Sequence, residues 1–317
     1  MVLISCVTFL SFLQLSVSNQ LIVEMPPTDT IEDESYVCRS IPFENIEKGY
    51  LESIQIDVDR SRVHHVATSV CEMPISKEIW ECKETQGSNC VGSSAGFGGW
   101  DRYTNDKGVF EFPDDLSLEL GSQTSMKYLV FQVHFSGKQI NQTKPAATLT
   151  LNISDKPRKY NFQGYLMGSR GFIPSNSPKG YYSNIACEWK LPGVKAFRYR
   201  MHTHHAGYHV EAFLVRNGTW TLLGSGSPQA KAKNWFEIPG GNVNIRRGDI
   251  LAARCLYINK EKTPIYFGMG DDNEMCLFGI EIGFHDKDKQ HFAQELLCET
   301  ESPTFQFKNF PGLLDYF

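Results

Sequence analysis

The stretch YLVFQVHF, residues 128–135, is typical of a β-strand because it is short and consists almost wholly of apolar, β-branched and aromatic residues. Similar short runs with alternating apolar residues occur at 53–59, 147–154, 209–215, 219–224 and 250–258. Segments rich in Gly, Pro and Asn separate them, such as GSSAGFGG (92–99), IPSNSPKG (173–180) and IPGGNVN (238–244). Many short strands divided by turns predict an all-β protein made of sandwiches or barrels.

The composition is that of a globular protein, with 41% hydrophobic and 21% charged residues among 317. The 31 Lys and Arg against 36 Asp and Glu give a net charge of −5, and no basic cluster is present, so we expect no nucleic-acid partner. Residues 1–18 are predicted to be a signal peptide, with Ser16 and Ser18 before a cleavage point at Asn19. No later run predicts a membrane span. We therefore expect a protein of the secretory pathway, in the vesicle lumen or secreted.

The cysteines support the same compartment. Cys6 leaves with the signal peptide, and the remaining eight predict four disulfides. Four of them precede residue 91 and four follow residue 186, which indicates two separately cross-linked domains, at 19–157 and 158–317. The sequons at Asn141, Asn152 and Asn217 predict a glycoprotein, although the Asn-Gly pair at 217 also fits a hairpin turn.

The histidines are the candidates for chemistry. The first half holds His64, His65 and His134, and three imidazoles suit Zn, Cu, Fe or Ni. An HH pair alone fits a surface or core pair equally well.

In the second half, MHTHHAGYHV (201–210) carries four histidines. If this stretch is a strand, His202 and His204 share one face, and His205 and His209 lie on the other. Their third ligand is left open by the sequence: it could be His285, His291, a carboxylate or Met275. A thioether beside two imidazoles would be a soft site that favours Cu(I).

Five motifs in order, VHHVATSVCEMP, VFQVHFSG, RMHTHHAG, GDILAARC and NEMC, resemble those of the copper type II, ascorbate-dependent monooxygenases, over residues 36 to 298. The resemblance implies two jelly-roll β-sandwich domains, each carrying one copper, across a solvent-filled cleft. It implies an electron-transfer copper in the first domain and an oxygen- and substrate-binding copper in the second. The implied ligands are His64, His65 and His134 for the first copper, and His202, His204 and Met275 for the second.

The same resemblance implies four disulfides. A fifth disulfide, which vertebrate relatives have, has no counterpart in this sequence. The implied pairs are Cys38–Cys82, Cys71–Cys90, Cys187–Cys298 and Cys255–Cys276. The last pair would fix the residue next to Met275.

Arg200 distinguishes two branches of the family. On a strand it shares a face with His202, so its guanidinium could hold a carboxylate next to the metal. The peptide-amidating branch carries arginine here and hydroxylates the α-carbon of the C-terminal glycine of glycine-extended peptides, using ascorbate and O2. That branch also has an asparagine and a tyrosine that help to hold the carboxylate, where this chain has Leu277 and Gly279.

The sequence therefore predicts a monofunctional peptidylglycine monooxygenase that catalyses the first step of peptide amidation and passes its product to a separate lyase. We expect no catalytic side chain beyond the copper ligands. One alternative is a catecholamine-type hydroxylase, similar to dopamine β-monooxygenase. Another is a secreted copper-binding β-sandwich protein without turnover.

Overall fold

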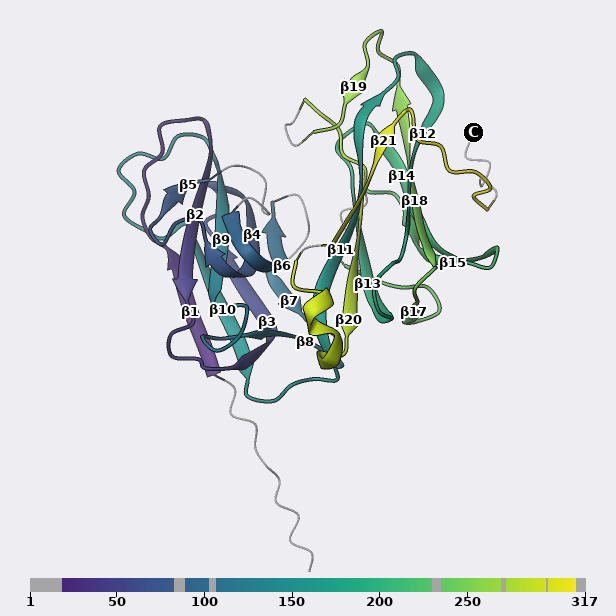
Figure 1. The fold of residues 1–317 in the computed structure, drawn as a ribbon. Helices are drawn as coiled ribbons and strands as arrows, with labels where there is room; N and C mark the ends of the chain where they lie inside the picture. Colours follow the sequence, from purple (N-terminus) through teal and green to yellow (C-terminus); the bar gives the residue numbers. More distant parts are fainter. Residues whose placement is uncertain are drawn as a thin grey trace, which may run out of the picture.

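The computed structural model describes residues 19–82, 89–102, 107–229, 235–268, 272–294 and 296–311. They form two β-sandwich lobes, one from the N-terminal half and one from the C-terminal half (Figure 1). The predicted all-β class is confirmed. The predicted signal peptide, residues 1–18, lies outside the described residues.

The N-terminal lobe packs two sheets together. One sheet has the order β1 (Asn19–Met25), β10 (Ala147–Ser154), β3 (Gly49–Val58) and β8 (Leu116–Leu120), with β7 (Val109–Glu111) also paired to β3. The other has the order β5 (Trp80–Glu81), β2 (Glu34–Pro42), β9 (Tyr128–Ser136), β4 (Val63–Pro74) and β6 (Cys90–Asp101).

The C-terminal lobe is also built from two sheets. The first contains β11 (Tyr160–Ile173), β20 (Leu277–Phe284), β13 (Val194–His202) and β16 (Phe236–Glu237), in that order. The strands β17 (Val243–Ile245), β19 (Ile265–Tyr266) and β21 (Leu296–Ser302) flank it, and the 3-10 helix η2 (Asp286–His291) follows β20. The second sheet has the order β12 (Ser177–Glu188), β18 (Ile250–Asn259), β14 (Gly207–Arg216) and β15 (Thr219–Gly226).

Each lobe has its own apolar core, as the alternating sequence pattern predicts. On β10, Leu149, Leu151 and Ile153 are buried at every second position and belong to the N-terminal core cluster. A second cluster fills the C-terminal lobe, with Phe278, Ile280 and Ile282 of β20 at its centre. The two cores are not wholly separate, because Phe162 of β11 and Phe197 of β13 belong to the N-terminal cluster.

The lobes are joined by a short parallel pairing between β8 and β11, in which Leu116 lies opposite Tyr160. This pairing makes the first sheets of the two lobes one continuous 12-stranded sheet. The buried side chain of Gln163 adds to the junction, because its Nε2 donates to the carbonyl oxygens of Ser94, Phe292 and Gln294. The chain crosses between β10 and β11, and we propose residue 157 as the domain boundary.

The prediction that GSSAGFGG separates two strands is wrong, because residues 92–99 lie inside β6. Its glycines allow close packing instead of a turn. A Cβ on Gly98 would lie 2.8 Å from the Phe110 ring, and one on Gly99 would lie 2.7 Å from the carbonyl oxygen of Val66. Only glycine fits at positions 98 and 99 of this strand.

All four predicted disulfides are present. They join Cys38 to Cys82, Cys71 to Cys90, Cys187 to Cys298 and Cys255 to Cys276. Each stays within one lobe, which confirms the expectation of two separately cross-linked halves.

The sequons differ in their surroundings. Asn141 and Asn217 are exposed and adopt positive φ values of 55° and 51°, and Asn217 lies in the turn between β14 and β15. The third, Asn152, lies within β10, and its amide donates to Ser53. Within the described ranges, no helix has the length and apolar character needed to cross a membrane.

Candidate metal centres

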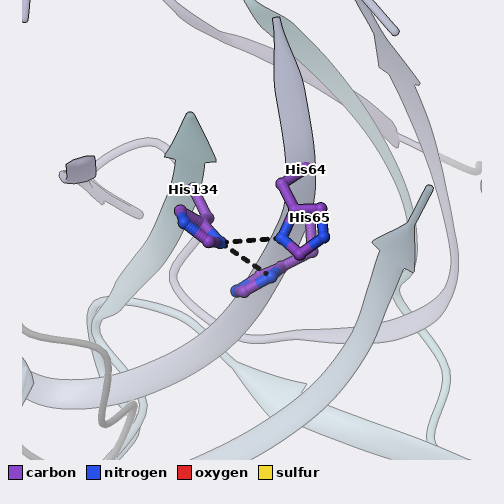
Figure 2. A group of neighbouring side chains, drawn as sticks. All are labelled: His64, His65 and His134. Atoms are coloured by element: carbon purple, nitrogen blue, oxygen red, sulfur yellow. Dashed lines mark hydrogen bonds between the residues drawn. The ribbon is translucent and has the colours of Figure 1, made fainter. Parts of the chain in front are cut away.

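Three histidines of the N-terminal lobe converge on one point (Figure 2). His64 and His65 come from β4 and His134 from the neighbouring strand β9. The Nδ1 atom of His134 lies 3.0 Å from Nδ1 of His64 and 3.3 Å from Nδ1 of His65. All the candidate donor atoms of this group lie within 4.8 Å of one another.

A strand irregularity explains how two consecutive histidines reach the same point. In a regular strand, His64 and His65 would point to opposite faces of the sheet. The register of β4 on β9 shifts between Val63 and His65, so that Val63 lies opposite Phe135 and His65 opposite His134. His64 is the extra residue, and such a bulge re-aims the side chain that it carries.

Two residues of β2 orient the His134 ring. Its Nε2 atom is bonded to a carboxylate oxygen of Glu34, and the Tyr36 ring stacks on it with centroids 4.1 Å apart and planes 11° from parallel. A carboxylate can only accept, so Nε2 carries the proton and Nδ1 keeps its lone pair toward the other two rings. Neither residue was singled out by the sequence analysis, because the pairing of β2 with β9 is what places them here.

The electrostatics of this group suit metal ligands. Burial, together with the neighbouring His134 and His64, lowers the pKa of His65 to about 4, so its ring is neutral at pH 7. Metal–nitrogen bonds of about 2.0–2.1 Å at near-tetrahedral angles place ligand nitrogens roughly 3.3 Å apart. The observed separations of 3.0 and 3.3 Å match that spacing. Three imidazoles at this spacing fit copper as well as zinc.

The second group lies in the C-terminal lobe, where the rings of His202 and His204 are 5.3 Å apart and nearly perpendicular, at 82°. The condition that 201–210 forms one strand is not met, because β13 ends at His202 and β14 begins at Gly207. The rings of His202 and His204 are neighbours all the same. His205 is exposed in the turn, and His209 on β14 contacts the Ser225 hydroxyl through Nε2, 2.9 Å away.

Glu274 ties the His204 turn to the segment that carries Met275. Its side chain is fully buried, and its carboxylate accepts the backbone N–H groups of His204 (2.9 Å), Ala206 (2.6 Å) and Met275 (3.1 Å). Both carboxylate oxygens are thus engaged with backbone donors, which is a positioning role and not that of a metal ligand. A carboxylate was one of the possible third ligands that the sequence allowed, but no sequence pattern predicted that Glu274 would bind backbone N–H groups.

Met275 is held from two further sides. The Tyr257 hydroxyl donates to its carbonyl oxygen at 2.6 Å, and Cys276, the next residue, is bonded to Cys255. The Nδ1 atom of His204 donates to the carbonyl of Asn273 at 2.8 Å, which leaves its Nε2 lone pair for a ligand. His285 is a poor third ligand, because it follows the C-terminal end of β20 while Met275 precedes the other end, roughly 25–30 Å away along the strand. His291 lies beyond it, at the end of η2.

His202 remains accessible to solvent, but protein atoms crowd it from several sides. This desolvation, with the neighbouring His204 and the positive charge of Arg200, lowers the pKa of His202 to about 4. His202 is also among the groups that lower the pKa of His65. The two histidine groups therefore lie within electrostatic range of each other, one on each lobe.

Arg200 lies on β13 opposite Gly279 of β20, two pairs along from His202 and Leu277. Directly opposed residues and every second residue share a face, so Arg200 and His202 project from the same side of the sheet, as the sequence predicted. The guanidinium carbon of Arg200 lies 5.4 Å from the centroid of the Trp235 ring. Arg198, two residues earlier, is paired instead with the buried Glu281, at 2.6 and 2.9 Å.

Known proteins resemble this chain along most of its length. The model of the copper type II ascorbate-dependent monooxygenase N-terminal domain matches residues 21–142, and that of the C-terminal domain matches residues 163–310. Peptidyl-glycine alpha-amidating monooxygenase of Mus musculus is 28% identical over 91% of the chain, and form A of Xenopus laevis is 27% identical over 92%. Human dopamine beta-hydroxylase is 24% identical over 53% of the chain and 30% of its own length.

The chain spans only about a third of the two amidating relatives, 29% of the mouse protein and 30% of the frog protein.

Acidification is expected to destabilise the metal-free protein through His65. Histidine titrates near pH 6.5 in an unfolded chain, whereas the folded pKa is about 4. Below pH 6.5 the unfolded state therefore binds the extra proton, and stability is lost as the pH falls toward 4. We expect the free energy of unfolding, measured by urea titration, to fall by roughly 1–3 kcal/mol over this interval, at about 1.4 kcal/mol per pKa unit.

The variant His65→Gln removes this group and should show a correspondingly shallower dependence on pH. His285→Gln, on the far side of β20, is the matched control and should behave like the wild type. Identical slopes for His65→Gln and the wild type would contradict the assignment.

Proposed function

The chain belongs to the copper type II ascorbate-dependent monooxygenase family, and we propose that it hydroxylates the α-carbon of the C-terminal glycine in glycine-extended peptides. The observation that carries this proposal is Arg200, which projects from β13 on the same face as His202. A guanidinium next to a metal ligand suits a substrate whose carboxylate is one bond from the reacting carbon.

The proposed metal sites divide the ligands between the lobes. His64, His65 and His134 would hold one copper through their Nδ1 atoms, which face one another. His202, His204 and Met275 would hold the other, with His204 offering Nε2 because its Nδ1 is bonded to the Asn273 carbonyl. Bound copper supplies one-electron transfer from ascorbate and the activation of O2.

The side chains of the protein bind and orient. Arg200 holds the terminal carboxylate, so that the adjacent methylene of glycine lies toward His202. Glu274 keeps the His204 turn and the Met275 segment in one arrangement during turnover. The reaction balances when O2, two electrons from ascorbate and two protons convert the C–H bond to C–OH and release one water.

The context of the reaction is part of the proposal. Four disulfides favour the oxidising lumen of the secretory pathway. The hydroxyglycine product is an N-acyl hemiaminal, whose C–N bond must be cleaved to release the peptide amide. We assign that cleavage to a lyase activity outside the two monooxygenase domains matched here.

Incubation with copper, ascorbate, O2 and a peptide ending in glycine should add one oxygen atom to the peptide, as measured by mass spectrometry. A copper chelator should abolish the gain, and the same peptide with a C-terminal amide should not react. Hydroxylation of tyramine with no change to the peptide would favour the catecholamine-type reading. Copper binding without ascorbate-dependent O2 consumption would favour a non-catalytic protein.

Arg200→Gln should raise KM for the glycine-extended peptide while the bound copper is retained. A charge-assisted bidentate contact contributes about 1.5–3 kcal/mol, which corresponds to roughly 10- to 150-fold at about 1.4 kcal/mol per decade. Arg200→Lys keeps the charge but not the bidentate geometry, so its KM should lie between those of the wild type and Arg200→Gln. Unchanged kcat/KM in Arg200→Gln would remove the residue from the substrate site.

Met275→Ile should lower the copper content from two ions toward one per chain, because isoleucine has no donor atom. Metal analysis after equilibration at fixed free Cu(I) is the measurement. Met201→Ile is the matched control, since Met201 packs in the C-terminal core, and it should keep both ions. Equal copper content in the two variants would show that Met275 is not a ligand.

A further inference from the structure

Arg200 differs from the other arginine on its strand face in what surrounds it. Arg198 is held by both carboxylate oxygens of Glu281, and its guanidinium carbon lies 5.3 Å from the centroid of the Phe110 ring and 5.8 Å from that of Trp235. Arg200 lies opposite Gly279, and its guanidinium carbon is 5.4 Å from the centroid of Trp235. Trp235 therefore contacts both arginines, and it packs closer to Arg200.

Gly279 gives the Arg200 side chain its room. A Cβ built on Gly279 would lie 3.0 Å from Cγ, 3.2 Å from Nε and 3.6 Å from Cδ of Arg200. The arginine stem therefore lies directly on the Gly279 backbone. A side chain at position 279 would require the Arg200 stem to shift away from β20.

Trp235 is itself held by the opposite lobe. It precedes β16, and it packs against the core cluster of the N-terminal lobe, with its ring centroid 6.3 Å from that of Phe110. A tryptophan wedged between the lobes offers a fixed, partly buried face to the guanidinium above it. The π face stabilises the cation without using any of its N–H donors.

We infer that Trp235 and Gly279 are positioning residues, which together hold the Arg200 guanidinium so that its N–H donors face the carboxylate of the peptide. The inference rests on the proposed function and specifies how its carboxylate selectivity arises. Trp235 supports the guanidinium on one side, and Gly279 leaves the space in which the Arg200 stem lies.

The test is the binding of two non-reacting peptides to copper-free protein, one ending in glycine with a free carboxylate and one ending in glycinamide. Isothermal calorimetry gives the ratio of the two dissociation constants for each variant. The wild type should prefer the carboxylate, and Arg200→Gln should bring the ratio close to one. Trp235→Leu should reduce the preference about 3- to 30-fold, the range expected for a partly desolvated cation–π contact.

Further variants separate positioning from folding. Trp235→Phe keeps an aromatic face and should retain most of the preference, whereas Gly279→Ala should lose part of it by displacing Arg200. Trp220→Leu removes a comparably half-buried tryptophan that contacts Phe213 and Phe310, and it should leave the ratio unchanged. In the Arg200→Gln background, Trp235→Leu should have no further effect on the ratio.

Two failures can be told apart. If the wild type binds both peptides equally, the proposed function itself is wrong. If the wild type discriminates but Trp235→Leu keeps the full preference, Trp235 does not position Arg200. The same conclusion follows if Trp235→Leu weakens the binding of both peptides by the same factor, with or without Arg200.

Discussion

The register of β13 on β20 places most of the second candidate centre. Because His202 lies opposite Leu277, the turn after β13 and the segment before β20 meet at the same end of the sheet. The buried Glu274 carboxylate then accepts N–H groups from both segments. A buried carboxylate is strongly destabilising without such donors. A slip of one residue would also turn Arg200 and His202 to the opposite face, so one register satisfies both requirements.

The first centre depends on a different device, an irregularity within a strand pair and not the meeting of two strand ends. The bulge in β4 brings adjacent histidines to one side, and β9 supplies the third ring from an almost fully buried position. Glu34 and Tyr36 of β2 then fix that third ring. Every residue of this centre lies on a strand of one sheet in the N-terminal lobe, whereas the second centre lies beside the junction with the other lobe.

Sequence patterns predicted what depends on residue type and spacing. The strands, the two cross-linked halves and the shared face of Arg200 and His202 follow from alternation and cysteine placement, and the disulfide pairs from the resemblance. The bulge at His64 could not be predicted, because nothing in VHH marks where the register shifts. The role of Glu274 was equally hidden, since its partners are backbone groups on a turn 70 residues away in the sequence. GSSAGFGG was wrongly predicted to separate two strands, because glycine occurs in closely packed strands as well as in turns.

The charges beside Arg200 bear on which substrate fits this face. Arg198 is flanked across the strands by two carboxylates, Glu281 of β20 and Glu237 of β16, whereas Arg200 faces Gly279. Burial raises the pKa of Glu281 to about 7, although the charge of Arg198 acts in the opposite direction. Acidification below pH 7 therefore neutralises the Glu281 carboxylate. The positive charge of Arg200, which shares a face with His202, also contributes to the lowered pKa of His202. An anionic peptide terminus is attracted to such a position, and a cationic amine is repelled from it. Under the proposed function, Arg200 is expected to favour peptides that end in a carboxylate over catecholamines, through repulsion of the amine as well as through attraction of the carboxylate.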